Sequence, residues 1–135
     1  MSYISKSARK AAITLATVAS AAMVQTSHAA ITSLVSFGDS LSDSGNLHAA
    51  AGFFPAPYAG LNSNGPVWVG HLSESLGLGV HTGSLTGGTA HGWAGARADI
   101  DVPVAPGLTL PSVQNQVSGY LASNGGVADP NTLYT

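Results

Sequence analysis

The sequence predicts an α/β domain built on a parallel sheet, because strand-like and helix-like segments alternate along it. Residues 31–37 form a short apolar, β-branched run that is typical of a buried central strand. Residues 66–76 and 111–123 repeat apolar side chains at helical spacing, and residues 132–135 begin a second strand. Strands in this order need helices to cover both faces of the sheet.

The first strand is expected to end at Gly38. Residues 39–46 are rich in Ser, Asp and Gly, which is typical of a turn from a strand into a helix. Residues 52–65 combine aromatic side chains with Pro, Asn and Gly, and we expect a surface loop there.

The first long helix is expected to open at Pro66, with Asn64 near its cap, since proline suits the first helical position. Gly77 and Gly79 would end this helix. Side chains at four-residue spacing predict its buried stripe, with the tryptophan in the core: Trp68, Leu72 and Leu76. Residues 83–95 are rich in glycine and predict no regular structure, and the prolines between residues 103 and 111 predict a further loop.

Pro111 is expected to open the second helix in the same way, and Asn124-Gly125 to close it in a left-handed conformation. Its predicted buried stripe has four members: Val113, Val117, Tyr120 and Leu121. Residues 129–131 read Asp-Pro-Asn and predict a turn before the last strand.

Composition excludes several classes of protein. The chain has 135 residues, enough for one domain, with four Lys and Arg against six Asp and Glu. So few charges exclude a coiled coil, a basic nucleic-acid-binding domain and a charge-rich disordered tail. The chain has no cysteine, which excludes disulfides and thiolate metal sites. Beyond residue 10 the only cation is Arg97, so this acidic part should repel nucleic acid.

Residues 1–29 have the order of a secretory signal peptide. Lys6, Arg9 and Lys10 precede an apolar stretch over residues 11–24, and Ser27-His28-Ala29 offers small side chains for cleavage. The stretch is shorter than the ~20 residues that span a membrane, which disfavours an anchor. We therefore expect a secreted or periplasmic bacterial protein whose folded part comprises residues 30–135.

The segment most informative about function is residues 37–46, Phe-Gly-Asp-Ser-Leu-Ser-Asp-Ser-Gly-Asn. A serine that follows a buried strand at the mouth of a helix could be a nucleophile, because helix N–H groups there can stabilise an oxyanion. Ser40 fits that position. It also fits an N-cap, which is the commoner use of such a serine, and its position alone favours the cap over the nucleophile.

This segment resembles the first block of the GDSL (SGNH) family of ester hydrolases, whose pattern is F-G-D-S-L-S-D-x-G-N. Residues 64–68, 88–97, 111–121 and 129–134 are similar, in order, to later segments of the lipase/lecithinase-like branch. The resemblance implies a three-layer SGNH-hydrolase-like fold, a parallel sheet flanked by helices, of which residues 30–135 would be the incomplete N-terminal part. It also implies a carboxylesterase or lipase that acts on small-molecule or lipid esters through an acyl-enzyme.

The resemblance assigns roles to individual residues. Ser40 would be the nucleophile, and its N–H would be one oxyanion donor. The N–H of Gly95 would be the second donor. Because the second block is degenerate here, Gly92 is its rival. Acidic and amide side chains at fixed positions of the first block would hold the turn: Asp39, Asp43 and Asn46. Aromatic residues in loops are candidates to line an acyl pocket or to pack locally: Phe53, Phe54, Tyr58 and Trp93.

The later family blocks, G-x-N-D and D-x-x-H, do not occur in the sequence. We expect the oxyanion Asn and the Asp and His of the triad to lie beyond residue 135, so that residues 1–135 are inactive alone. His48 and His91 could lie near Ser40 but fit loop or surface positions better, and His71 should face solvent. No His-Glu-x-x-His motif occurs, and we expect no metal and no cofactor.

The alternative function is a secreted non-catalytic binding module, or a relic, on a hydrolase-like scaffold. The sequence leaves open the ester, the oligomeric state and any membrane anchoring through a C-terminal part.

Overall fold

The computed structural model describes residues 30–53 and 60–135. The predicted signal peptide, residues 1–29, lies outside these ranges. So do Phe54 and Tyr58, two of the residues expected to line an acyl pocket or to pack locally.

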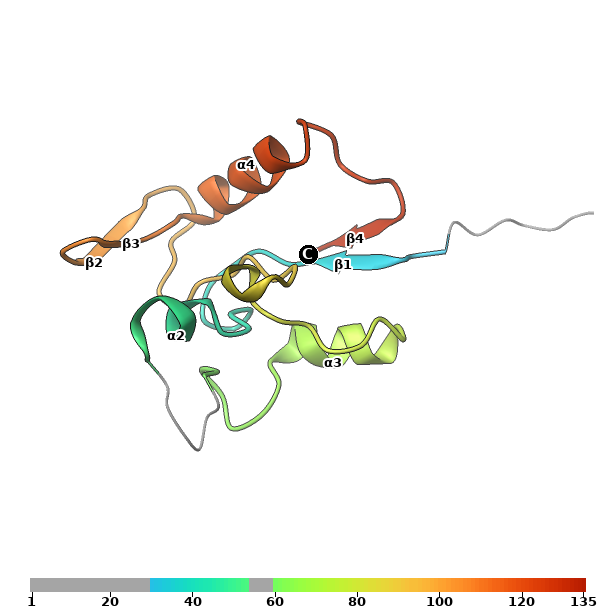
Figure 1. The fold of residues 1–135 in the computed structure, drawn as a ribbon, viewed down its shortest axis with the longest axis horizontal. Helices are drawn as coiled ribbons and strands as arrows, with labels where there is room; N and C mark the ends of the chain where they lie inside the picture. Colours follow the sequence, from blue (N-terminus) through green and yellow to red (C-terminus); the bar gives the residue numbers. More distant parts are fainter. Residues whose placement is uncertain (1–29, 54–59) are drawn as a thin grey trace, which may run out of the picture.

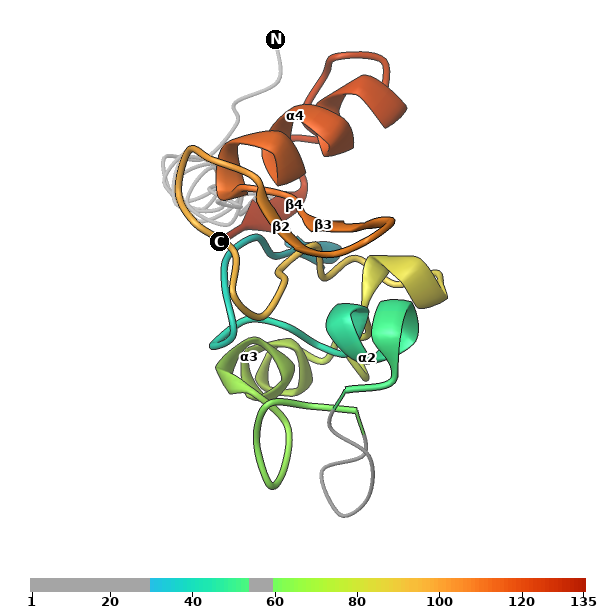
Figure 2. The ribbon, with the colours of Figure 1, turned by 90° about the vertical axis from the view of Figure 1, so that its left-hand side faces the viewer.

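The described chain is an α/β structure around a parallel two-stranded sheet. Strand β1 (Ser33–Val35) pairs in parallel with β4 (Thr132–Tyr134), and Leu34 lies opposite Leu133. Helix α4 (Val113–Ser123) lies on one side of this sheet and helix α3 (Trp68–Ser75) on the other (Figures 1 and 2). The short helix α2 (Asn46–Ala51) lies on the same side of the sheet as α3 and contacts a 3₁₀ turn at residues 84–86 (Figure 2). The predicted parallel sheet with covering helices is thus confirmed.

Strand β1 is buried because it lies between these helices. Leu34 and Val35 are each 2 % exposed, as the apolar run predicted. The pairing continues past the strand ends, since Phe37 N–H donates to the Thr135 carbonyl at 2.9 Å. On the opposite edge, Ser36 forms a parallel bridge with Ala90. The chain therefore leaves the sheet at residue 37, directly before the serine turn described below.

The predicted buried stripe of α3 is wrong. Trp68 is 49 % exposed and Leu76 is 39 % exposed, whereas the buried residues of the helix are Val69, Gly70 and Ser73. The helix begins after Val67, which is extended at φ −72° and ψ 167° and offers no side-chain cap. Pro66 therefore precedes the helix instead of opening it. The helix turns its small residues toward the interior, which lets it lie close to its neighbours.

The loop predicted between residues 103 and 111 is instead an antiparallel hairpin. Strands β2 (Val102–Ala105) and β3 (Leu108–Leu110) pair with a register shift between Pro103 and Ala105. Proline is tolerated in a strand at such an irregularity or at an edge, because it lacks a ladder N–H. Gly107, at φ 79°, makes the turn.

Helix α4 begins at a side-chain cap that the sequence analysis missed. Ser112 is fully buried and its Oγ accepts the Asn115 N–H at 3.3 Å. The exposed Asp101 accepts the Ser112 N–H at 2.7 Å, and this bond is the main reason that the pKa of Asp101 is lowered. The predicted stripe of this helix is only half-buried, and its one buried residue is Gln116. Beyond the helix, Gly125 adopts the expected left-handed conformation.

Residues 83–95 are more ordered than their glycine content predicted. They contain a 3₁₀ turn, η1 (Ser84–Thr86), and bridges that join Ala90 to both Ser36 and Gly83. A small core cluster of Leu47, Ala94 and Leu110 joins this segment to α2 and the hairpin. The segment is therefore fixed against the elements on either side of it.

No helix among residues 30–53 and 60–135 is both long enough and apolar enough to cross a membrane.

Candidate functional site

The candidate site is centred on a tight turn after β1, residues 38–43, which we call the serine turn. The Asp39 carbonyl accepts the Ser42 N–H at 3.0 Å, and its carboxylate accepts the Leu41 N–H at 3.0 Å. Ser40 lies between these two bonds and is half-buried. Within the described chain, neither its hydroxyl nor its backbone N–H makes a hydrogen bond. Both groups are therefore free to meet a ligand.

Asp43 closes the serine turn and caps α2. Its buried carboxylate accepts the backbone N–H groups of four residues, at distances between 2.7 and 3.2 Å: Gly45, Asn46, Leu47 and Ala94. Three of these donors belong to the start of α2. The helix amides are thus occupied by Asp43, and the expectation that they would stabilise an oxyanion is wrong. The N-cap alternative for Ser40 is wrong too, since Gly45 precedes the helix.

Asn46 is fully buried and fixes the other side of the site. Its Nδ2 donates to the carbonyls of Ala90 at 2.8 Å and Gly92 at 2.9 Å. Its Oδ1 accepts the Leu85 N–H at 3.0 Å. The side chain would also block any Cβ at Gly83, which would lie 2.7 Å from Oδ1. The structural roles expected for Asp39, Asp43 and Asn46 agree with these bonds.

Residues 92–95, which we call the facing segment, lie against the serine turn. The Trp93 N–H donates to the Gly38 carbonyl at 3.0 Å, and the Ala94 N–H donates to Asp43 at 2.8 Å. These bonds join the facing segment to both ends of the turn that holds Ser40. Gly95 directly follows Ala94, so the two predicted site residues belong to neighbouring segments.

Gly92 and Gly95 differ in a way that bears on which of them could serve as an oxyanion donor. Gly92 is buried, and a Cβ there would lie 2.9 Å from the backbone oxygen of Ser42. Its lack of a side chain allows the two segments to approach. Gly95 is exposed, has φ +90°, and its N–H makes no hydrogen bond within the described residues. An incoming oxygen would reach the amide of Gly95 more easily than that of buried Gly92.

Gln116 of α4 contacts the serine turn although it is 78 residues from Gly38 in the sequence. Its Oε1 accepts the Gly38 N–H at 2.8 Å, and its Nε2 donates to the Gly38 carbonyl at 3.0 Å. This residue was not among those predicted from the sequence. Its signal is a polar side chain three residues after Val113 and one before Val117, inside the predicted apolar stripe.

Trp68 also reaches the site, although it is not a core residue. Its Nε1–H donates to Ser42 Oγ at 3.2 Å. The indole therefore covers the serine turn while about half of its surface stays in solvent.

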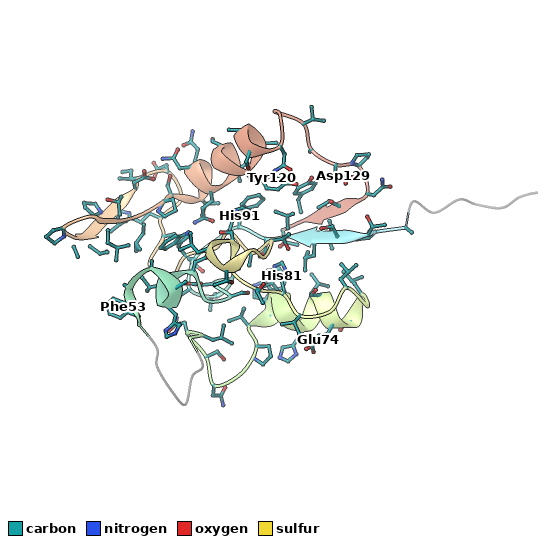
Figure 3. The ribbon with its side chains drawn as sticks, in the orientation of Figure 1. Phe53, Glu74, His81, His91, Tyr120 and Asp129 are labelled. Atoms are coloured by element: carbon teal, nitrogen blue, oxygen red, sulfur yellow. The ribbon has the colours of Figure 1, made fainter. Side chains whose placement is uncertain are left out.

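No described histidine forms a hydrogen bond with the Ser40 hydroxyl. His71 is exposed, as predicted, and His48 Nδ1 is joined to the Phe53 carbonyl. His91 stacks on Phe37 with ring centroids 5.5 Å apart and lies on the α4 side of the sheet (Figure 3). Burial lowers the pKa of His91. None of these imidazoles is placed to take a proton from Ser40.

His81 instead pairs with a different serine. Its Nε2 lies 2.8 Å from Oγ of the fully buried Ser36, on the α3 side of the sheet (Figure 3). Its Nδ1 lies 3.4 Å from Thr89 Oγ1, which donates its proton to the Leu34 carbonyl at 2.6 Å. Thr89 must then accept from Nδ1–H, so Nε2 accepts the proton of Ser36. Burial, and secondarily the charge of His91, lower the pKa of His81.

Within the described ranges, no three His, Asp or Glu side chains are grouped so that they could hold a metal ion. The sequence matches no model of a known protein family and no curated protein.

Proposed function

We propose that the chain carries the nucleophile and two oxyanion donors of a secreted serine ester hydrolase with an SGNH-type fold. Ser40 Oγ would add to the ester carbonyl carbon while the N–H groups of Ser40 and Gly95 donate to the carbonyl oxygen. The bond from that carbon to the alcohol oxygen then breaks, and the alcohol leaves with the proton that Ser40 has given up. Water attacks the acyl group on Ser40 and releases the acid. The substrate is a small-molecule or lipid ester.

The observation that carries this proposal is the alignment of the serine turn with the facing segment. Two hydrogen bonds, from Trp93 to Gly38 and from Ala94 to Asp43, set the segments side by side. The hydroxyl of Ser40 and the amides of Ser40 and Gly95 have no partner within the described chain. A fixed scaffold around unpaired donors is what oxyanion stabilisation requires. The helix–sheet–helix layers and the match to F-G-D-S-L-S-D-x-G-N support the same fold and chemistry.

The step that the described residues do not support is removal of the Ser40 hydroxyl proton. A serine hydroxyl attacks slowly unless a base removes its proton, and losing a triad member costs several orders of magnitude in rate. Since no described imidazole forms a hydrogen bond with Ser40, we expect negligible ester turnover from residues 1–135 alone. Turnover of a short-chain chromogenic ester that Ser40→Ala abolishes would show that the chain supplies a base.

The nucleophile is tested by labelling with a fluorophosphonate, which phosphonylates activated serines. We expect one adduct per chain on Ser40, located by peptide mass spectrometry, forming faster when imidazole is added as an external base. Ser40→Ala and urea-unfolded protein should not be labelled. The proposal fails if the folded chain takes no adduct even with imidazole present, or if the adduct persists in Ser40→Ala.

Among residues 30–53 and 60–135 no histidine is bonded to Ser40, and this favours a second candidate, a secreted binding module that keeps the scaffold without the reaction. A folded chain that takes no fluorophosphonate, even with imidazole present, would support this candidate.

A further inference from the structure

We propose that Gln116 is a positioning residue for Ser40, acting through the backbone of Gly38. This inference rests on the proposed function, because it assigns a residue that aligns the nucleophile with its oxyanion donors. Gln116 lies on α4, 78 residues from Gly38, and is 5 % exposed.

The contact is specific for a carboxamide. Gln116 accepts the Gly38 N–H at 2.8 Å and donates to the Gly38 carbonyl at 3.0 Å, while its second Nε2 proton goes to the Pro111 carbonyl at 3.1 Å. Only an uncharged amide offers an acceptor and two donors in this arrangement. An ionised carboxylate would lack both donors. An aliphatic side chain would leave the Gly38 N–H and the Pro111 carbonyl without this partner, and the Gly38 carbonyl with only the Trp93 N–H.

Gly38 is the residue at which the chain turns from β1 into the serine turn. Its φ of +135° is open to glycine but strained for other residues, and a Cβ would lie 3.1 Å from Ser42 Oγ. Outside the sheet, its N–H and carbonyl lack a strand partner, and Gln116 supplies both bonds. These two bonds between Gln116 and Gly38, which we call the clamp, therefore set the direction in which Asp39 and Ser40 leave the strand.

The Gly38 carbonyl also accepts the Trp93 N–H at 3.0 Å. One carbonyl oxygen thus receives a bond from α4 and a bond from the facing segment that leads to Gly95. Without the bond from Gln116, this oxygen is held only by the Trp93 N–H. Ser40 and Gly95 can then shift relative to each other. A displacement of about 1 Å at reacting groups is enough to lower a rate about a hundredfold.

The test compares Gln116→Glu with Gln114→Glu in the full chain. Gln114 is exposed on the same helix, so both variants carry the same charge change. The measurement is the rate of fluorophosphonate labelling at Ser40 in imidazole, relative to the wild type, across pH. At pH 8 we expect Gln116→Glu to label at least about tenfold more slowly and Gln114→Glu to match the wild type. As the pH falls and the new carboxyl takes a proton, it regains one donor, so its relative rate should rise.

A carboxylate that simply unfolds the chain would also recover on protonation, so near-ultraviolet circular dichroism at each pH must show that both variants are folded. Equal labelling of Gln116→Glu and the wild type at pH 8 overturns the positioning role. Absence of label on wild-type Ser40 overturns the proposed function instead. If Gln116→Glu does not fold, the test is the rate of hydrogen exchange at the Gly38 N–H of the wild type. Slow exchange of the Gly38 N–H supports the clamp, and exchange as fast as that of an exposed loop amide contradicts it.

Discussion

Asp43 and Ala94 are 51 residues apart in the sequence, yet the Asp43 carboxylate accepts the Ala94 N–H at 2.8 Å. The same buried carboxylate accepts three N–H groups at the start of α2. One side chain thus ties the end of the serine turn to the helix behind it and to the facing segment in front of it. Its negative charge is compensated by N–H dipoles, and no described cation forms an ion pair with it.

We therefore expect Asp43→Asn to destabilise the fold by about 3 kcal/mol, because charge-assisted bonds are lost and an amide group turns toward N–H donors. The measurement is the free energy of unfolding in urea. Asp99→Asn removes an exposed carboxylate that makes no hydrogen bond with a described residue, and should stay within about 0.5 kcal/mol of the wild type. Equal effects of the two substitutions would mean that the Asp43 bonds contribute little.

Gly92→Ala tests the close approach of the two segments. The added Cβ would lie 2.9 Å from the backbone oxygen of Ser42, which cannot move without distorting the serine turn. We expect a loss of about 2 kcal/mol in the free energy of unfolding, as for overpacked sites. Gly119→Ala on α4 is the matched control, since its Cβ would meet nothing within 4 Å. Because alanine favours helix more than glycine does, that control should be stabilised by up to about 1 kcal/mol.

Local signals in the sequence predicted much of this fold. The apolar run before Gly38 and the final run at residues 132–135 both form strands, and they pair in parallel as expected. The turn before the final strand is also confirmed, with the Asn131 N–H bonded to Asp129. These elements depend on residues close in the chain, where propensity and turn chemistry decide the conformation.

Errors arose where tertiary contacts decide the conformation. Trp68 has helical spacing with Leu72, but its indole bonds to Ser42 and stays half-exposed. In the sequence, Gln116 interrupts an apolar stripe. In the fold it is buried, because its carboxamide bonds to the N–H and carbonyl of Gly38, which is distant in the sequence. The position of Ser40 between a strand and a helix predicted free helix amides, and Asp43 takes them. Spacing along one element cannot show which distant partner it meets.

The two tyrosines that join α4 to β4 provide a prediction at high pH. The hydroxyls of Tyr120 and Tyr134 lie 3.1 Å apart, and this bond is the main cause that raises the pKa of Tyr120 from 10.0 to about 12. Tyr134→Phe should lower the pKa of Tyr120 toward 10, as measured by tyrosinate absorbance. A raised pKa means that this stabilisation is complete below pH 10 and is lost as the pH rises toward 12. An unchanged pKa in the variant would show that the bond does not hold the proton.

His81 provides the opposite dependence, at low pH. Its pKa is lowered from 6.5, chiefly by burial, so the unfolded chain binds a proton more readily than the folded chain does. Stability is therefore complete above pH 6.5 and falls as the pH drops below that value toward the lower folded pKa. The groups around the imidazole do not oppose this loss, because Ser36 and Thr89 are neutral and His91 adds positive charge when it is protonated.

We expect wild-type stability to urea to fall steadily between pH 7 and pH 5, with a smaller fall in His81→Gln. That variant should start from a lower stability at pH 7, since the bond to Ser36 is changed. His91 also has a lowered pKa, so His91→Gln should remove a further part of the slope. The control is His71→Gln, whose side chain is exposed and which should keep the wild-type slope. An identical slope in His81→Gln and His71→Gln would show that protonation of the buried imidazole does not set the acid sensitivity. The strand edge at Ser36 would then tolerate a charge on the buried imidazole bonded to it, at little cost in stability.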